Sequence, residues 1–419
     1  MAFPMSRTVI AAGSPAFKRI NRAMVFGGFS TFALLYCVQP LMPLLARQFT
    51  LTPAQSSLAL SVSTAMLALS LLLSSVVSDR IGRKPMMVAA MFGGAVLTVA
   101  CAFAHNYGQL LALRGLLGVA LGGMPAIAMA YLGEEIEGPS LGLSMGLYIG
   151  GSAFGGMLGR VVSSVIADFY SWRLALVVIG AAGLYSAWEF RRSLPASTNF
   201  RPGQRRGFGA LAGGIRTHCT DAGLPWLFAL SFLLMGCFVS LYNYIGYRLL
   251  GAPFSLSQSG VGLLSVLYLL GIFSAVWAGR LADRLGRRNV LWLVMALMLA
   301  GLLLTLASAL AVIVLGVGLF TFGFFASHSV ASSWVGRRAQ APQALASALY
   351  LFFYYLGSSV IGSFCGVLWS RAGWPGVVAL LGATLGVSFV IALRLRGLVP
   401  LTAAPVQSSA PPLPAVRPG

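Results

Sequence analysis

Charged residues are scarce in this sequence, and acidic residues are the scarcest. Asp and Glu together number 8 among 419 residues, and all charged residues make up 9% of the chain. Because soluble chains carry about 25% charged residues, a soluble globular fold is excluded. Apolar residues take their place: 58% of the chain is hydrophobic, and the mean hydropathy is +0.87.

Groups that perform catalysis or bind metals are also few. The five cysteines, four of them inside apolar runs, have neither the pattern of a disulfide framework nor a metal-ligand spacing. The sequence contains no Ser/His/Asp set, no cofactor loop and no nucleotide-binding loop. We therefore expect a protein that is not an enzyme, uses no cofactor or metal, and has no built-in ATP motor.

Apolar runs of about 20 residues, long enough to cross a bilayer as helices, recur along the chain. They cover residues 23–46, 58–78, 86–105, 110–132, 141–163, 173–192, 226–248, 260–280, 290–309, 312–335, 343–368 and 375–395. The pattern predicts an all-α integral membrane protein with twelve transmembrane helices, six in each half.

The two halves repeat a short basic motif. Residues 75–84 read SVVSDRIGRK and residues 279–288 read GRLADRLGRR, so the two aspartates are 283 − 79 = 204 residues apart. Such a repeat predicts two pseudo-symmetric six-helix halves, an architecture of transporters. We expect the halves at 1–192 and 226–395, a cytoplasmic linker at 193–225, and a disordered tail at 396–419.

The net charge of +20 would suit nucleic-acid binding, but its distribution excludes that function. With the N-terminus in the cytoplasm, Lys and Arg collect on one side, in both termini, the motif loops and the linker. The other side holds only Arg47, Arg173, Arg248 and Arg371. This positive-inside pattern predicts a multi-pass protein with both termini cytoplasmic, surrounded by a lipid bilayer.

The paired D-R-x-G-R-[RK] loops, after the second and eighth spans of a six-plus-six bundle, resemble the signature loop of the major facilitator superfamily. The resemblance covers about residues 20–400. The second copy fits fully, whereas the first has Ser75 at the usual opening glycine. Residues 110–118 resemble the fourth-span motif of this family, which holds a buried arginine.

Further motifs indicate which branch of this family the chain resembles. Residues 151–156 resemble the fifth-span antiporter motif G-P-x-x-G-G, formed here by Gly151, Ser152, Gly155 and Gly156, with serine at the proline position. Residues 39–43 resemble the first-span P-x-x-P motif of drug:proton antiporters. The runs 32–40 and 242–248 resemble the YnfM-type bacterial inner-membrane transport proteins, which are grouped with drug and arabinose efflux permeases. The resemblance implies the bacterial inner membrane and efflux.

The resemblance also implies that the motif loops form a cytoplasmic latch. An aspartate at a helix end can accept hydrogen bonds from the N-terminus of a neighbouring helix. The family architecture places Asp79 near the start of span 11 and Asp283 near the start of span 5. The basic residues can pair with local acids, for which Glu134, Glu135 and Glu137 are candidates, and the glycines allow a tight turn. The expected latch residues are Asp79, Arg80, Gly82, Arg83, Lys84, Asp283, Arg284, Gly286, Arg287 and Arg288. The alternative is a plain loop that anchors the positive side.

Several residues inside the spans are candidates for solute binding or coupling. Arg114 would bind an anionic group, hold a coupled network, or donate to backbone carbonyls of a neighbouring span. Arg160 is expected nearer the outer interface, where its side chain could snorkel. Spans 1, 4, 7 and 10 line the cavity in this family, which implies solute contacts for Tyr36, Gln39, Tyr242, Asn243 and His328; packing is the alternative for the aromatic residues and the histidine.

The energy source is the least defined feature. None of the eight carboxylates falls near the middle of a span, and Gln39 stands at the first-span position where proton-coupled relatives often carry an acid. Coupling would have to use His328, Glu189, Asp168 or the cytoplasmic acids.

Together these patterns predict a monomeric secondary transporter that exports a small organic or drug-like solute by alternating access, coupled to proton influx. Two alternatives remain within transport, namely metabolite uptake by symport and uniport. From another class, a non-transporting receptor or scaffold is the alternative. A scaffold would need neither intact motif loops nor Arg114, which favours transport.

Overall fold

The computed structural model describes residues 10–200, 208–339 and 343–397, where every regular element is a helix. The first half contains α1 (Pro15–Tyr36), η1 (Gln39–Leu41), α2 (Met42–Gln48), α3 (Pro53–Ile81), α4 (Arg83–Cys101), α5 (Tyr107–Leu121), α6 (Pro125–Glu135), α7 (Gly138–Phe169) and α8 (Trp172–Ser193). Then follow α9 (Phe208–Cys219), α10 (Leu224–Leu250), α11 (Gln258–Leu263), η2 (Leu264–Leu267), α12 (Tyr268–Leu285), α13 (Arg287–Leu304), α14 (Leu310–Arg338) and α15 (Gln343–Arg396).

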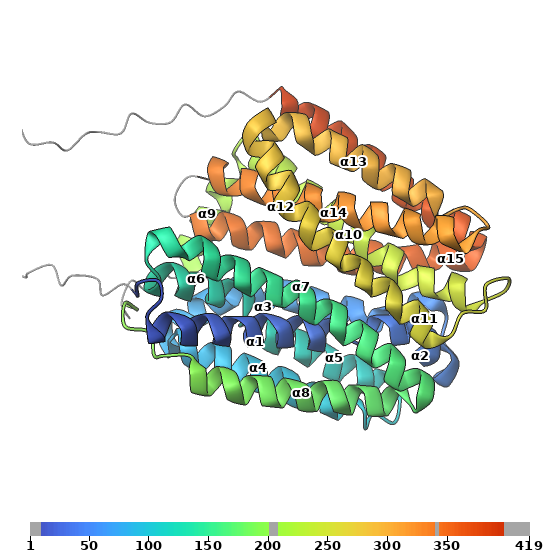
Figure 1. Cartoon of the computed structure of the whole chain (residues 1–419), viewed down its shortest axis with the longest axis horizontal. Helices are drawn as coiled ribbons and strands as arrows, with labels where there is room; N and C mark the ends of the chain where they lie inside the picture. The colour runs from blue at the N-terminus through green and yellow to red at the C-terminus, as the bar shows by residue number, and fades with distance from the viewer. Residues whose placement is uncertain (1–9, 201–207, 340–342, 398–419) are drawn as a thin grey trace, which may run out of the picture.

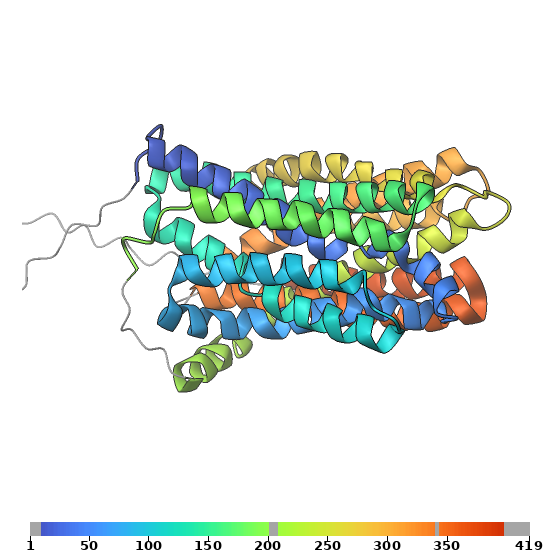
Figure 2. The same ribbon diagram turned by 90° about the horizontal axis from the view of Figure 1, so that it is seen from below.

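The helices run along the long axis of the molecule and form two bundles (Figures 1 and 2). In Figure 1 the first half lies below and the second half above. The halves meet where α7 packs against α11 and where α3 packs against α15. The end of the molecule that carries both motif loops is called the motif end below, and the opposite end is called the distal end.

Eleven segments of the described chain are long and apolar enough to cross a membrane. The last of them contains two of the predicted spans, because Gly373 interrupts α15 with φ 58° and ψ −148°, outside the helical region. Pro375 follows two residues later and lacks the N–H that a continuous helix would need. With α15 divided at this kink, the predicted twelve spans are confirmed.

The first span is broken where a single helix was predicted at 23–46. Its helix α1 starts earlier than predicted, at Pro15, because the Ser14 side chain accepts a hydrogen bond from the backbone N–H of Phe17 and caps the N-terminus. It ends at Tyr36, and the chain continues as the short helices η1 and α2. Pro40 opens the first of these and Pro43 the second, as expected for a residue with no N–H to donate. The break brings Gln39 to the boundary between the halves.

Equivalent glycines hold equivalent helices together in the two halves. A Cβ atom on Gly155 of α7 would overlap the carbonyl oxygen of Phe29 on α1. The same relation recurs 202 and 203 residues later, where a Cβ atom on Gly357 of α15 would overlap the carbonyl of Phe232 on α10. Only a residue without a side chain permits this approach of two backbones. The internal repeat is therefore present in packing as well as in sequence.

The described part of the predicted linker includes α9, which packs against α10 and α15. After it, Asp221 binds the guanidinium of Arg338 through two hydrogen bonds of 2.6 and 3.0 Å. Burial acts to raise the pKa of Asp221, but hydrogen bonds from Arg338 and from the N–H groups of Leu224 and Gly223 hold this pKa below its ordinary value. The end of the linker is thus fixed to the second half. The predicted disordered tail lies outside the described residues from 398 onward.

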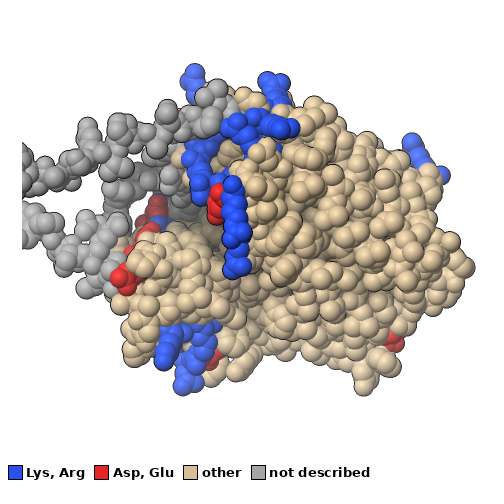
Figure 3. Space-filling model, turned by 45° about the horizontal axis from the view of Figure 1, so that its top comes forward, with Lys and Arg blue, Asp and Glu red and all other residues tan. Residues whose placement is uncertain are grey.

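Basic side chains gather at the motif end. On the face shown in Figure 3, Lys and Arg cluster toward the end at which α1 begins in Figure 1, and the flank along the helices is almost free of charge. An uncharged flank suits contact with lipid, because a charged side chain in hydrocarbon is costly.

Candidate functional site

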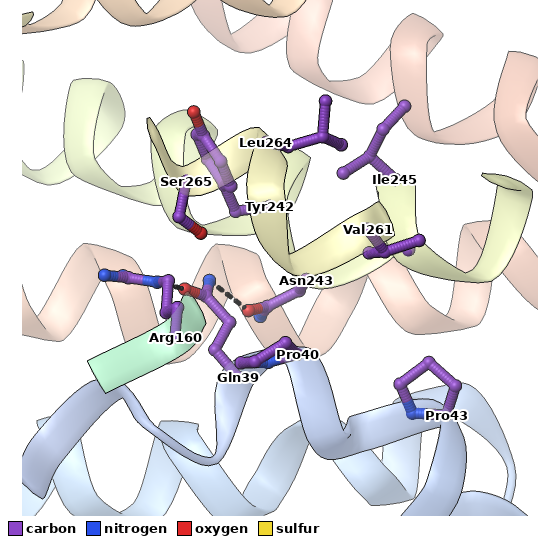
Figure 4. A pocket seen from close by; sticks show the side chains of 11 residues that line it. Gln39, Pro40, Pro43, Arg160, Tyr242, Asn243, Ile245, Val261, Leu264 and Ser265 are labelled. Carbon is purple, nitrogen blue, oxygen red and sulfur yellow. Dashed lines mark hydrogen bonds between the residues drawn. The ribbon is translucent and has the colours of Figure 1, made fainter. Parts of the chain in front are cut away.

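A pocket lies between the two halves in the distal part of the molecule (Figure 4). It occupies about 340 Å³, including space open to solvent. Its lining comes from the break in span 1, from α7, α10, α11 and η2, and consists of Gln39, Pro40, Pro43, Arg160, Tyr242, Asn243, Ile245, Gly246, Val261, Leu264 and Ser265. Three of the predicted solute-contacting residues, Gln39, Tyr242 and Asn243, therefore share one pocket.

A chain of polar side chains crosses the pocket from one half to the other. Gln39 accepts a hydrogen bond of 2.5 Å from Arg160 Nε and donates one of 2.7 Å to Asn243 Oδ1 (Figure 4). It also donates to the backbone carbonyl of Val239, at 3.2 Å. All three polar side chains are buried. Gln39 and Asn243 are 204 residues apart, the same offset as the motif aspartates, so equivalent positions of the repeat meet here.

Arg160 lies at the centre of this site, in the distal part of the molecule, and the snorkelling considered for its side chain is not seen. Its residue exposure is only 3%, so it does not snorkel. Its Nη1 donates to the carbonyl of Gly156, and its guanidinium carbon lies 4.3 Å from the ring centre of Tyr36 and 4.8 Å from that of Tyr268. Such contacts with two ring faces stabilise a cation. Tyr36, another predicted solute contact, thus adjoins the pocket.

The sequence holds a feature, besides hydropathy, that could have indicated where Arg160 lies. Gly156 of the antiporter motif lies four residues before it, so both residues share one face of α7. A Cβ atom on Gly156 would lie 3.2 Å from Arg160 Nη1, which leaves little room for any other residue. Ser152, at the proline position of the motif, donates to the carbonyl of Tyr148 on its own helix. Gly151, like Gly155, lies directly against α1.

Arg114 does not reach this pocket. It is fully buried, and its guanidinium donates to three backbone carbonyls: Ala59 at 2.8 Å, Leu34 at 3.1 Å and Leu35 at 2.6 Å. Leu34 and Leu35 belong to the last turn of α1, where carbonyls lack helical N–H partners and the helix dipole favours a positive charge. This is the geometry of the third alternative, an arginine bonded to backbone carbonyls. It holds the end of α1 next to the break that carries Gln39.

His328 lies in a separate aromatic cluster within the second half. Its Nδ1 is 3.0 Å from the hydroxyl of Tyr350, and its ring centre is 4.8 Å from that of Tyr354. Phe324 and Phe238 connect this cluster to the pocket: the ring of Phe238 stacks on Phe324 at 3.8 Å and meets that of Tyr242 at 5.2 Å. The rings of His328, Phe324, Phe238 and Tyr242 therefore form a continuous series, called the aromatic wall below, that leads to the pocket.

The first motif loop forms a compact ion-pair network. Arg83 binds Asp79 at 2.9 Å and forms a fork with Glu134 at 2.9 and 3.3 Å, as expected for an acid at the end of span 4. Gly82 turns the chain with a φ of +100°, which L side chains rarely adopt. Lys84 donates to the carbonyl of Leu194, and Arg80 is exposed.

The second motif loop repeats this arrangement with different partners. Asp283 binds Arg287 at 2.8 Å and Arg337 at 3.2 Å, and Gly286 turns the chain with a φ of +85°. The described residues contain no hydrogen bond or ion pair from Asp283 to the start of span 5, the position that the resemblance implies. Arg284 is exposed, and Arg288 donates to the carbonyl of Arg396.

Glu135, one of the expected partners of the basic residues, binds the start of the linker instead. Its buried carboxylate accepts hydrogen bonds from Ser197, Thr198 and Asn199, including both backbone N–H groups of the last two. In the same segment, the ring centre of Phe200 lies 5.0 Å from the guanidinium carbon of Arg83. The segment after α8 is therefore fastened to the first half.

Comparison with known proteins gives consistent matches. The family model described as Major Facilitator Superfamily matches residues 24–251 and 244–417. The chain is 48% identical to the inner membrane transport protein YnfM of Escherichia coli (strain K12), over 92% of this chain and 93% of the relative. It is 46% identical to the uncharacterized MFS-type transporter YybF of Bacillus subtilis (strain 168), over 93% and 95% of the two chains.

Solved structures agree on the fold. A bacterial homologue of the human lysosomal transporter Spinster superposes with a TM-score of 0.73 at 14% identity, covering 92% of this chain and 97% of the other. The nucleoside transporter NupG superposes with a TM-score of 0.74 at 15% identity, covering 90% and 99%. At such low sequence identity these matches support the arrangement of the helices, and they say nothing about which solute this chain binds.

Proposed function

The chain belongs to the major facilitator superfamily, and from that premise we propose that it exports a small organic or drug-like solute by alternating access, driven by proton influx. It is a membrane transporter and not an enzyme, since its family and its relatives are transporters. The proposal places the protein in the bacterial inner membrane as a monomer, with the motif end and both termini in the cytoplasm. The positive charge gathered at the motif end supports this orientation.

The contacts between the halves carry the proposal of alternating access. In the described chain, hydrogen bonds that join the halves in the distal part include Gln39–Asn243, Gln39–Val239, Ser56–Tyr247, Pro40–Gln258 and Asp168–Ser259. At the motif end, by contrast, the ion pairs of each motif loop stay within one half. A bundle closed at one end is one state of a rocking cycle around a central site.

We propose that the motif loops form the latch of the opposite state. When the motif end closes, Asp79 and Asp283 approach the start of a helix in the other half, and the positive N-terminal dipole stabilises each carboxylate. The local ion pairs hold both aspartates oriented until then. The latch therefore changes the ratio of two states and does not build the fold.

Asp79→Asn and Asp283→Asn should each slow transport while leaving folded protein in the membrane. A hydrogen bond to a charged group contributes about 1.5–3 kcal/mol, which is enough to shift a state ratio roughly tenfold or more. Stability should change little, since Asp283 is 57% exposed and exposed ion pairs contribute little. Initial flux in proteoliposomes and thermal unfolding in detergent measure the two effects. Flux at the wild-type rate in both variants would reduce the motif loops to anchors.

Proton coupling is proposed through His328. Among the other candidates, Glu189 is engaged in an ion pair of 2.6 Å with Arg22, and Asp168 accepts a backbone hydrogen bond at the distal end. His328 instead lies on the aromatic wall, half-buried beside Tyr350 and Tyr354. Its imidazole has two ring nitrogens and can bind and release a proton at one of them.

A proton gradient, acidic on the distal side, should accelerate export from proteoliposomes. In His328→Gln, the amide keeps a hydrogen-bonding group but cannot titrate, so the dependence of flux on pH should flatten while solute binding persists. Flux that follows only the solute gradient, in the wild type as well, would identify a uniporter. Acceleration of uptake by the same gradient would identify a symporter.

A further inference from the structure

We propose that the group recognised by this transporter is a carboxylate, bound by Arg160 between the rings of Tyr36 and Tyr268. The inference rests on the proposed transport function and names the class of solute: small organic acids with a flat apolar body. Neither the motif loops nor the family match requires an anion, so the proposal depends on the pocket alone.

The charge of Arg160 has no counter-charge within the described chain. Its Nε and Nη1 donate to neutral acceptors, Gln39 and the Gly156 carbonyl, and it forms no ion pair in the described ranges. On the same helix the nearest acid is Asp168, eight residues away, which is about 12 Å along the axis. A buried charge is costly unless it is paired. An anionic solute would offset this cost and a cationic solute would add to it, so the site favours an anion.

Donor groups without partners belong to residues that lie near the same guanidinium. The hydroxyls of Tyr36 and Tyr268, whose rings contact Arg160, are buried and have no hydrogen-bond partner in the described chain. The Nδ2 amide of Asn243, next to Gln39, is also buried and unpaired. An unsatisfied buried donor destabilises the protein. A carboxylate has about four lone-pair sites and accepts from a guanidinium and hydroxyls together.

The two halves differ at the position of Arg160. The position equivalent to Arg160 in the second half is Gly362, 202 residues later. A Cβ atom there would lie 3.4 Å from Asn243 Nδ2 and 3.7 Å from Ser61 Oγ. One half thus supplies a cation, and the other half has a residue without a side chain at the equivalent position.

Aromatic side chains lie next to the charge, and one of them, Tyr242, lines the pocket itself. The ring of Tyr268 lies 5.2 Å from that of Tyr242 and 5.6 Å from that of Phe325, in edge-to-face arrangements. Phe32 stacks on Tyr36 at 6.0 Å. Ring faces of this kind pack best against a flat apolar body. Benzoate and its ring-substituted relatives combine such a body with one carboxylate.

The test compares matched ligands on the purified full-length protein. Benzoate, 4-hydroxybenzoate and indole-3-acetate are each paired with the neutral amide of the same shape, and stabilisation against heat reports binding at millimolar concentration. We expect the carboxylates to bind and the amides to bind roughly tenfold more weakly or worse, since the amides lose the charge-assisted hydrogen bonds. Equal binding of acid and amide, or no binding by any of the three acids, would overturn the inference.

Variants assign the effect to Arg160. Arg160→Gln should remove the preference for the acid, Arg160→Lys should keep part of it, and Tyr268→Phe should weaken acid binding while leaving amide binding unchanged. Arg371 of α15 is exposed, so Arg371→Gln is the control: it makes the same change in charge outside the pocket. An acid preference that persists in a folded Arg160→Gln protein would contradict the assignment. If Arg160→Gln does not fold, loss of acid binding in Tyr268→Phe supports the site, and its persistence overturns it.

Flux separates this inference from the proposed function. The acid that binds is loaded into proteoliposomes and its release is followed. Binding without release would contradict transport but keep the carboxylate site. Transport of neutral or cationic solutes, unaffected by Arg160→Gln, would keep transport and contradict the carboxylate site.

Discussion

Replacing Arg114 by lysine should damage the protein nearly as much as replacing it by alanine. The planar guanidinium of Arg114 donates to three carbonyls on two helices, α1 and α3, which a single ammonium cannot reach together. Arg114→Ala removes three buried hydrogen bonds from a charged donor, at about 1.5–3 kcal/mol each. We expect a loss of several kcal/mol in the alanine variant and most of that loss in the lysine variant, measured as thermal unfolding in detergent.

A control for Arg114 exists in the same half. Arg173 donates through one nitrogen to the single carbonyl of Ala104 and is partly exposed. Arg173→Lys should therefore unfold close to the wild-type temperature. If Arg114→Lys also unfolds like the wild type, a point charge is sufficient and the role of the planar fork is refuted.

The second large effect is expected at Gly155, where α7 touches α1. Any Cβ atom at this position would overlap the Phe29 carbonyl, so even Gly155→Ala must push the two helices apart. Overpacking typically costs about 1–3 kcal/mol and occasionally more, and here the obstacle is backbone rather than a flexible side chain. The displacement should also move Arg160 on the same helix, so both thermal stability and flux should fall.

Gly150→Ala is the matched control on the same helix, since a Cβ atom there would meet nothing within 4 Å. It should be neutral or slightly stabilising, because alanine favours a helix over glycine by roughly 0.5–1 kcal/mol. Equal behaviour of the two variants would show that the antiporter motif does not act through close packing of α1 and α7.

The apolar runs and the repeat were sufficient to predict the fold. Twelve spans, two halves and the turn glycines Gly82 and Gly286 follow from local sequence, because span length and positive φ are local requirements. The interruption at Gly373 falls between the predicted spans 343–368 and 375–395. The break after Tyr36 was not predicted, since a long apolar stretch conceals an interruption of the helix.

The site was predicted less completely, because its centre depends on contacts between the halves. The structure brings Gln39, Tyr242 and Asn243 to one pocket, and the repeat offset of 204 residues could have paired Gln39 with Asn243. Arg160 was expected nearer the outer interface, with snorkelling as one possibility, because its position in the span does not show which side chains of the other half it contacts. Tyr268 was missed, since nothing in the sequence marks which tyrosine faces a particular arginine.

The claim of alternating access is tested most directly by locking the distal end. In a background without native cysteines, Asp168→Cys and Ser259→Cys place thiols where the Asp168 carboxylate now accepts from the Ser259 N–H at 3.1 Å. We predict that the oxidised double variant holds the distal end closed and does not transport, and that reduction restores flux to the level of the reduced control. Each single variant should be insensitive to oxidation. Flux at an unchanged rate through the cross-linked protein would contradict alternating access between the two halves.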